Sequence, residues 1–367
     1  MFSGLKFYFS VQGKKYYSDI EAAPVACKLK EPLVFHLNYD FIQNANWQKE
    51  PVYPIHYYLD LHSRILNEKY DQIILMYSGG TDSHTALESF IRCKIKNIIL
   101  YDTVSAEQLS YNGRKKMNEG VIHSLKKYSQ QFKDLNYKVM SPKVDSNDYV
   151  WSSTPKEFEE TIKTFKPQKF YDIAMTSSWY RLYTEKNNHI RIDTSKKKTA
   201  VVYGFEKPMI GIRNNYWEWY MPSHEIVSAK MLATDAYDDV FFFITDDVPE
   251  IQIKLAWLKI EILERLAAVH NKGEVRLGGW QTYNSPFYEQ INEYMGYKAV
   301  NALMNSAAYK PGSPLHNETK KAFYKLEHPG IKRIIDDIKA SMGNQQILRS
   351  SETVKIKKVP DWLIQKI

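Results

Sequence analysis

The middle of the chain alternates between continuous apolar runs and amphipathic stretches, which predicts strands separated by helices. Residues 73–77 form an apolar run with turn residues behind it, as is typical of a strand buried on both faces. Leu87, Phe90 and Ile91 would form the inner face of a following helix. Similar patterns predict strands at 97–101, 137–140, 172–175 and 200–203, and helices at 113–132 and 155–165. This alternation indicates an α/β fold, a parallel sheet flanked by helices.

The two ends of the chain follow other patterns. Short alternating segments at 5–9 and 33–37 predict strands, and a helix is expected at 55–69. Beyond residue 246 the apolar positions step by three and four, which indicates a helix, and further helices are predicted from Ser285, at 317–327 and at 330–341. We therefore divide the chain into a small β-rich N-terminal region (1–70), an α/β domain (71–245) and a helical C-terminal region (246–367) that we expect to determine substrate specificity.

Composition is that of an ordinary globular protein. The 367 residues are 44% hydrophobic and 25% charged, which suits two domains or one domain with a large extension. The formal charge is +8 without a continuous basic arm, so a phosphate-bearing substrate explains it as well as a nucleic acid does. The 27 tyrosines fit either base stacking or the burial of large side chains with a polar tip.

Cysteine content and hydropathy exclude several classes of protein. Cys27 and Cys93 cannot form a disulfide framework or a four-thiolate metal site, so we expect no zinc and no iron–sulfur cluster. No run approaches the roughly 18 apolar residues that span a bilayer, and the first residues do not resemble a signal peptide. We therefore expect a cytoplasmic protein that does not associate with membranes.

Residues 77–84 carry the strongest chemical signal in the chain. Two glycines, Gly79 and Gly80, separate a predicted buried strand from a predicted helix. Glycine lets backbone N–H groups approach an oxyanion, and a helix start adds unpaired N–H donors and the positive end of its dipole. Hydroxyl donors and one carboxylate surround the glycines: Ser78, Thr81, Ser83 and Asp82. An anion site beside a carboxylate that can hold a divalent cation indicates a nucleotide phosphate with Mg²⁺.

The six residues from Ser78 to Ser83 (Ser-Gly-Gly-Thr-Asp-Ser) resemble the signature of the N-type PP-loop ATP pyrophosphatases. This superfamily includes asparagine synthetase, GMP synthetase, NAD synthetase, enzymes that thiolate or lysidinylate tRNA, and the 7-cyano-deazaguanine synthases. Its loop binds the β- and γ-phosphates of ATP while a substrate oxygen attacks the α-phosphate, which releases pyrophosphate and leaves an adenylated intermediate. The resemblance covers roughly residues 71 to 205, and five fixed residues of six should arise by chance in about one chain in two thousand.

The resemblance implies roles for individual residues. Asp82 would ligate Mg²⁺, and the phosphates of ATP would be bound by Ser78, Gly79, Gly80, Thr81 and Ser83. The end of the next strand, Tyr101-Asp102-Thr103, lies where the family holds adenine and ribose. The segment is not a Walker P-loop, because no Gly-Lys-Ser/Thr follows the glycines, and Gly-x-Gly-x-x-Gly is absent.

Missing residues narrow the reaction that the resemblance implies. The deazaguanine synthases need a cysteine-ligated zinc, several tRNA thiolases need paired cysteines, and sulfonucleotide reductases need a C-terminal cysteine, whereas Cys93 is the last cysteine here. Neither cysteine is residue 2, so the N-terminal cysteine glutaminase of asparagine synthetase is missing. We therefore expect a ligase that adenylates a carboxylate or carbonyl oxygen and joins the activated group to a nitrogen nucleophile. The nucleophile would be an amine of a second substrate, or ammonia from solution or a partner protein.

Further candidate residues lie after other predicted strands. Lys207 and Arg213 follow the strand at 200–203 and would neutralise the α-phosphate, because ligands collect past the carboxyl ends of parallel strands. Arg181 follows the strand at 172–175 and would bind an acidic substrate. His84 is a candidate general base, although a histidine at a helix start is more often structural. We interpret five acidic residues as caps and loop residues rather than a second metal site: Asp235, Asp238, Asp239, Asp246 and Asp247.

Two alternatives to a small-molecule ligase stay open. An enzyme of this superfamily that modifies a base of tRNA or DNA fits the sequence pI near 9.0 and the aromatic content of 14%, and salt-dependent nucleic-acid binding would reveal it. A scaffold that senses nucleotide without turnover would share the fold but could lose Asp82 or a glycine without penalty. A homo-oligomer is compatible with each of the three.

Overall fold

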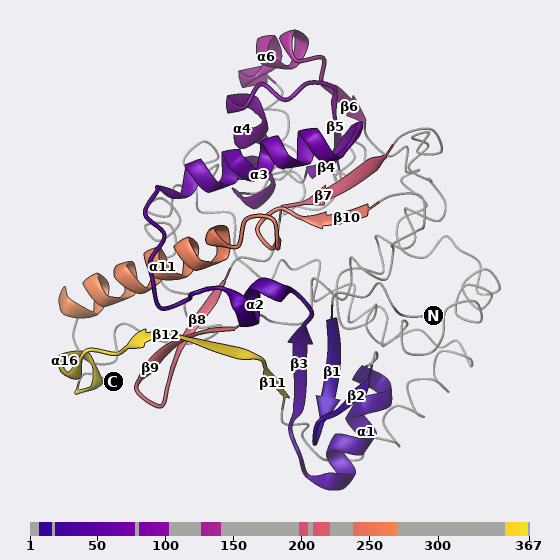
Figure 1. Ribbon diagram of the computed structural model, residues 1–367. Helices are drawn as coiled ribbons and strands as arrows, with labels where there is room; N and C mark the ends of the chain where they lie inside the picture. The colour runs from indigo at the N-terminus through magenta and orange to yellow at the C-terminus, as the bar shows by residue number, and fades with distance from the viewer. Residues whose placement is uncertain are drawn as a thin grey trace, which may run out of the picture.

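The computed structural model of the chain describes residues 7–16, 19–77, 81–102, 126–140, 198–204, 208–220, 238–269 and 349–365 (Figure 1). The described residues form a five-stranded, a four-stranded and a three-stranded sheet. The helices and strands predicted at 113–125, 155–165, 172–175 and 285–341 lie outside these ranges.

The five-stranded sheet is parallel throughout, with β4 (Gln72–Tyr77) at its centre. Strands β5 (Ile98–Asp102) and β6 (Lys138–Met140) lie on one side of β4, and β7 (Thr199–Tyr203) and β10 (Asp238–Phe241) lie on the other. All six residues of β4 and all five of β7 are buried, which explains why both segments are continuous apolar runs. The predicted parallel sheet with flanking helices is confirmed.

Helices α3 (Ile55–Lys69) and α4 (Thr81–Arg92) pack side by side against this sheet (Figure 1). The hydroxyl oxygens of Ser63 and Ser89 lie 2.7 Å apart between them, and Arg92 donates a hydrogen bond of 2.7 Å to the Asp60 carboxylate. A short helix, α6 (Ser129–Asp134), precedes β6. Across the described ranges, no helix combines the length and apolar character that a membrane span requires.

The four-stranded sheet is built mainly from the N-terminal region. Its order is β11-β3-β1-β2, with β1 (Phe7–Val11), β2 (Lys14–Tyr16), β3 (Leu33–Leu37) and β11 (Arg349–Ser351). Alternate residues of β1 and β3 are buried, among them Phe9 and Phe35, whose ring centroids are 5.3 Å apart. Helices α1 (Asp19–Leu29) and α2 (Asp40–Asn44) flank β3 in the chain. The strands predicted at 5–9 and 33–37 correspond to β1 and β3, and helices α1, α2 and α3 lie between and after them.

A three-stranded antiparallel sheet follows β7 in the chain and was not predicted. Strands β8 (Met209–Arg213) and β9 (Tyr216–Tyr220) form a hairpin, and β12 (Thr353–Lys358) completes the order β12-β9-β8. Asn214 and Asn215 connect the hairpin with φ angles of 49° and 61°, the left-handed values that a tight two-residue turn requires and asparagine tolerates. Helix α11 (Glu250–Val269) covers one face of this sheet through hydrogen bonds to Trp217 and Trp219.

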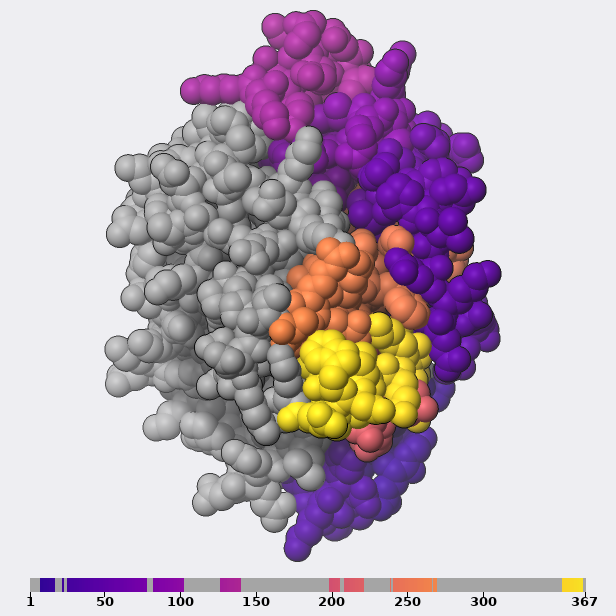
Figure 2. All heavy atoms as spheres, turned by 90° about the vertical axis from the view of Figure 1, so that its left-hand side faces the viewer, coloured from indigo at the N-terminus to yellow at the C-terminus, as the bar shows by residue number. Residues whose placement is uncertain are grey.

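One C-terminal segment adds a strand to two different sheets. β11 pairs in parallel with β3, and β12, two residues further on, pairs antiparallel with β9. Glu352 lies between them and donates its N–H to the carbonyl of Phe35 at 2.8 Å. The segment and the short helix α16 (Asp361–Ile364) lie at the surface beside α11 (Figure 2). The C-terminal region therefore contains the predicted helix α11, but it also contains two strands, β11 and β12, for which no partner had been predicted.

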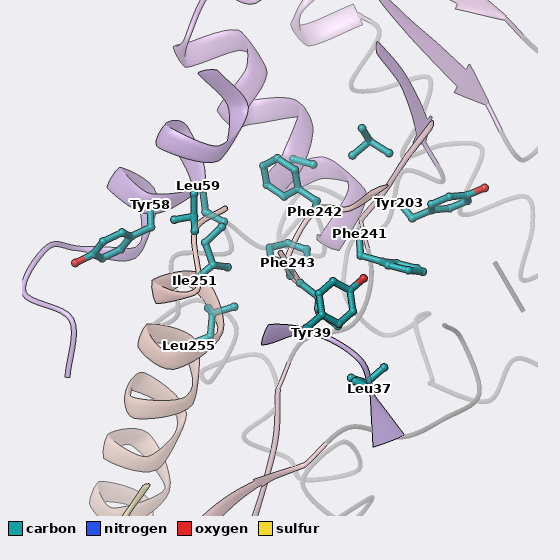
Figure 3. Close-up of a cluster of buried hydrophobic side chains, with 14 of the residues drawn as sticks. Leu37, Tyr39, Tyr58, Leu59, Tyr203, Phe241, Phe242, Phe243, Ile251 and Leu255 are labelled. Carbon is teal, nitrogen blue, oxygen red and sulfur yellow. The ribbon is translucent and has the colours of Figure 1, made fainter. Parts of the chain in front are cut away.

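A single aromatic cluster joins the parallel sheet to its surroundings (Figure 3). Tyr203 at the end of β7 packs on Phe241 with ring centroids 5.9 Å apart, and Phe242 and Phe243 follow directly. Residues from β3, the start of α2, α3 and α11 surround these rings: Leu37, Tyr39, Tyr58, Leu59, Ile251 and Leu255. The N-terminal sheet, the parallel sheet and α11 thus share one hydrophobic core.

His62 in α3 makes the stability of this core sensitive to acid. Its Nδ1–H donates to the carbonyl of Phe242 at 3.0 Å, and complete burial lowers its pKa from 6.5 to about 4. Because the folded pKa lies below the unfolded one, the unfolded chain takes up a proton first as the pH falls below 6.5. We expect the free energy of unfolding to fall by about 2 kcal/mol between pH 7 and pH 5 from this residue alone.

Urea unfolding of wild type and His62→Asn at both pH values measures this effect. Asparagine keeps a short amide donor for Phe242 but does not titrate, so the difference between pH 7 and pH 5 should shrink by that amount. An equal pH dependence in the two proteins would show that His62 does not cause it.

Candidate functional site

The order of strands in the parallel sheet defines one position where ligands collect. From β4 the chain adds β5 and β6 on one side and then crosses to add β7 and β10 on the other. The loops that leave the carboxyl ends of β4 and β7 therefore diverge, and in open α/β sheets ligands bind in the crevice at such a switch point. These two strand ends are the position from which we build the site.

The segment that leaves β4 enters α4 within a few residues. β4 ends at Tyr77 and α4 begins at Thr81, while Ser78, Gly79 and Gly80 lie outside the described residues. In the first turn of α4, Asp82 is partly exposed and Ser83 is 4% exposed. The first backbone N–H groups of a helix have no partner within the helix, so a helix start is a common binding position for an anion.

Gly204, directly after β7, packs on this first turn. A Cβ atom built on Gly204 would lie 2.6 Å from the Cα of Ser83, 2.7 Å from its N and 2.9 Å from the carbonyl carbon of Asp82. These are backbone atoms of a helix start, so they cannot rotate away as the end of a side chain could. Only glycine allows the two chain segments to approach this closely, and the contact fixes the start of α4 against the end of β7.

His84 is buried beneath the same turn. It is 2% exposed, its Nδ1 lies 3.0 Å from the hydroxyl of Tyr77, and its Nε2 lies 3.6 Å from the carboxylate of Glu88. Tyr128 donates a hydrogen bond of 2.9 Å to Glu88, and burial together with Glu88 raises the pKa of Tyr128, so its hydroxyl keeps its proton. These contacts link the end of β4 to α4 across residues 78–80, which favours the structural interpretation of His84.

The candidate nucleoside residues lie at the same edge of the sheet. Tyr101 is 7% exposed within β5 and pairs with Met76, and the backbone of Asp102 pairs with that of Tyr77. The carboxyl ends of β4 and β5 therefore lie side by side, at Tyr77 and Asp102. Thr103 lies outside the described residues, as do Arg181 and Lys207.

The structure places Arg213 far from this edge. It is exposed at the end of β8, paired with Tyr216 next to the hairpin turn. It lies four residues, at about 3.4 Å each, from the first residue of β8, and the hairpin extends away from the parallel sheet (Figure 1). The described structure does not bring Arg213 together with Asp82 and Ser83.

Lys259 is a candidate that sequence reasoning missed. It lies in α11 at 7% exposure, and its ammonium group is 3.4 Å from the carbonyl of Pro208, four residues past Gly204. A buried lysine is rare, and this one reaches the chain that leaves the carboxyl end of β7. The sequence did contain one indication that Lys259 is buried. Lys259 and Gln252 are polar residues seven positions apart on the apolar stripe of α11.

The acidic residues before α11 have structural partners. Tyr70 donates to Asp238 at 2.9 Å, the N–H of Phe41 donates to Asp246 at 3.1 Å, and Lys69 lies 3.7 Å from Asp247. Asp235 and the side chain of Asp239 are not described. Within the described part of the chain, no three potential metal-ligating side chains come together.

Comparison with models of known protein families, with curated proteins and with solved structures finds no match to this chain. The site is therefore interpreted from its own residues and geometry.

Proposed function

We propose that the chain is an ATP pyrophosphatase of the PP-loop type, a ligase that adenylates a carboxylate or carbonyl oxygen and transfers it to a nitrogen nucleophile. The observation that carries the proposal is the contact of Gly204 with the first turn of α4 at the switch point of the sheet. This contact fixes the Asp82–Ser83 turn against the end of β7, and we expect the phosphates of a nucleotide to bind at this turn. The strand before the glycines and the helix after them are the context that the Ser78–Ser83 motif requires.

The residues of this turn suit a nucleotide with Mg²⁺. The N-terminal amides of α4 would bind phosphate oxygens, and residues 78–81 would add backbone and hydroxyl donors. Asp82 supplies a carboxylate oxygen in the first turn, and Mg²⁺ is commonly held by one or two carboxylates together with substrate phosphates. Lys259 is placed to add positive charge beside the segment that leaves β7, in the role first assigned to Lys207 and Arg213.

Product analysis with α-labelled ATP and Mg²⁺ tests the proposal. Wild type should form AMP and pyrophosphate when pooled metabolites that contain carboxylates and amines are added. Asp82→Asn keeps the shape of the side chain but removes its charge, and it should lower turnover by about 10²-fold or more. Asp361→Asn changes a carboxylate that is 83% exposed in α16 and serves as the matched control.

Each other outcome has a definite meaning. ADP and phosphate as products would show that ATP is cleaved between its β- and γ-phosphates, which contradicts the proposed reaction. Stimulation by tRNA or DNA rather than by metabolites would favour the base-modifying alternative. Tight ATP binding without any turnover would favour a nucleotide-sensing scaffold.

A further inference from the structure

The two faces of the three-stranded sheet differ in their polar side chains. On one face the tryptophan N–H groups have hydrogen-bond partners, and on the other lies a carboxylate, Glu218, with an unpaired oxygen. On the first face, Trp217 donates to Glu264 at 2.9 Å and Trp219 donates to Gln252 at 3.0 Å, both in α11. Successive residues of a strand point to opposite faces, so Glu218 points away from α11, together with Tyr216 and Tyr220.

Glu218 is buried, and one of its carboxylate oxygens has no partner in the part of the chain that the structure describes. It is 5% exposed, and its Oε2 atom accepts no hydrogen bond. Among the described residues no basic side chain forms an ion pair with it. Burying a carboxylate without a partner is strongly unfavourable, and buried polar groups in folded proteins are almost always satisfied. The carboxylate at this position therefore needs a partner that the described residues do not supply.

The neighbours of Glu218 suit a cation. Directly across on β8 is Gly211, which has no side chain, and the ring of Tyr220 leans towards it, 3.3 Å from where a Cβ would be. Directly across on β12 is Lys355, but its ammonium group lies over the ring of Tyr216, 4.7 Å from the centroid. Glu218 is thus flanked along its strand by Tyr216 and Tyr220, and its neighbour on β8 contributes no side chain.

We propose that Glu218 binds an ammonium or guanidinium group of a small-molecule substrate, with Tyr216 and Tyr220 on either side of it. A carboxylate supplies a charge-assisted hydrogen bond, and aromatic faces attract cations. The sheet that carries Glu218 begins directly after Pro208, on the chain that leaves the carboxyl end of β7. If the proposed ligase function holds, the bound group belongs to the substrate that supplies the nitrogen nucleophile. This assignment of the substrate rests on the proposed function, whereas the binding of a cation does not.

Thermal unfolding of Glu218→Gln with and without simple amines tests this site. Without ligand, the variant should melt at a higher temperature than wild type, because it removes an unpaired buried charge. n-Butylammonium and n-butylguanidinium chloride should raise the melting temperature of wild type, with dissociation constants at least tenfold lower than for Glu218→Gln. Sodium n-butyrate, which has the same chain with the opposite charge, should have no effect on either protein.

Glu264→Gln is the matched control variant, because Glu264 serves the other face of the same sheet and is paired with Trp217 and with Lys357 at 2.9 Å. It should melt at a lower temperature than wild type and respond to the amines as wild type does. If Glu218→Gln also melts lower, and Lys355→Met lowers the melting temperature by the same amount, Lys355 is the partner of Glu218 and the proposal is wrong. Equal amine responses of Glu218→Gln and wild type would also overturn it.

These measurements need no ATP, so they separate the two proposals. Amine binding that depends on Glu218, in a protein that fails to form AMP, would retain the site and reject the ligase. AMP formation with no Glu218-dependent amine binding would retain the ligase and reject the site.

Discussion

Gly204→Ala is expected to reduce the affinity for ATP with Mg²⁺ by about 10²-fold. The added methyl group would meet the backbone of Ser83 at 2.6 Å, so the start of α4 must move by roughly 1 Å from the end of β7 to restore normal contact. A displacement of about 1 Å in a group that positions a substrate can cost on the order of 10²-fold. Forcing an extra carbon into packed structure should also lower the free energy of unfolding by about 1–3 kcal/mol.

Isothermal titration with ATP and Mg²⁺ and urea unfolding together measure this result. Gly211→Ala is the matched glycine for the unfolding experiment, since its Cβ would meet only the side chain of Tyr220, which can rotate. It should change the free energy of unfolding by less than about 1 kcal/mol. Wild-type nucleotide affinity in Gly204→Ala would mean that the first turn of α4 does not contact the nucleotide.

Trp219→Ala is expected to cause the largest loss of stability, about 3–5 kcal/mol. Trp219 is 1% exposed, its ring centroid lies 5.1 Å from that of Trp47, and its N–H donates to Gln252. Gln252 in turn donates to the carbonyl of Phe243 at 2.8 Å. The substitution therefore removes a large buried side chain at the point where β9, α11 and the N-terminal region meet.

Urea unfolding compares this variant with Trp362→Ala, which removes the same side chain from a position that is 42% exposed. The control should lose about 1 kcal/mol or less. Trp219→Phe separates packing from hydrogen bonding, because it keeps much of the volume and loses the N–H. Equal destabilisation by the two alanine variants would show that Trp219 does not join these elements.

The elements that the sequence predicted well are those whose burial follows a local pattern. β4 and β7 are buried on every side, so their apolar runs stand out, and the 3.6-residue period of α11 is visible over twenty residues. The three-stranded sheet has no such local signal. Its strand β12 reads Thr-Val-Lys-Ile-Lys-Lys, which looks like a basic tail until β9, more than 130 residues earlier in the chain, pairs with it.

The residues of the candidate site also differ in whether a local sequence pattern reveals them. The Ser78–Ser83 motif could be recognised because adjacent residues carry it, and the structure confirms that a strand precedes it and that a helix begins within it at Thr81. Gly204 and Lys259 matter through distant partners, Ser83 and Pro208, which no sequence pattern reveals. Arg213 was chosen for its position after a strand. It lies exposed at the end of β8, beside a hairpin turn that the sequence did not predict.

The double pairing of the C-terminal segment also sets an order for assembly during synthesis. One edge of β3 gains its partner β11 only about 300 residues after β3 has been made, which corresponds to roughly 15–60 s at 5–20 residues per second. Over that interval β3 has an unpaired edge, the kind of surface that pairs with other chains. One edge of β9 likewise stays unpaired until β12 has been synthesised. A ribosome that stalls or stops before residue 349 would therefore release a chain in which the apolar strands β3 and β9 replace β11 and β12 as edge strands, and such chains are expected to aggregate.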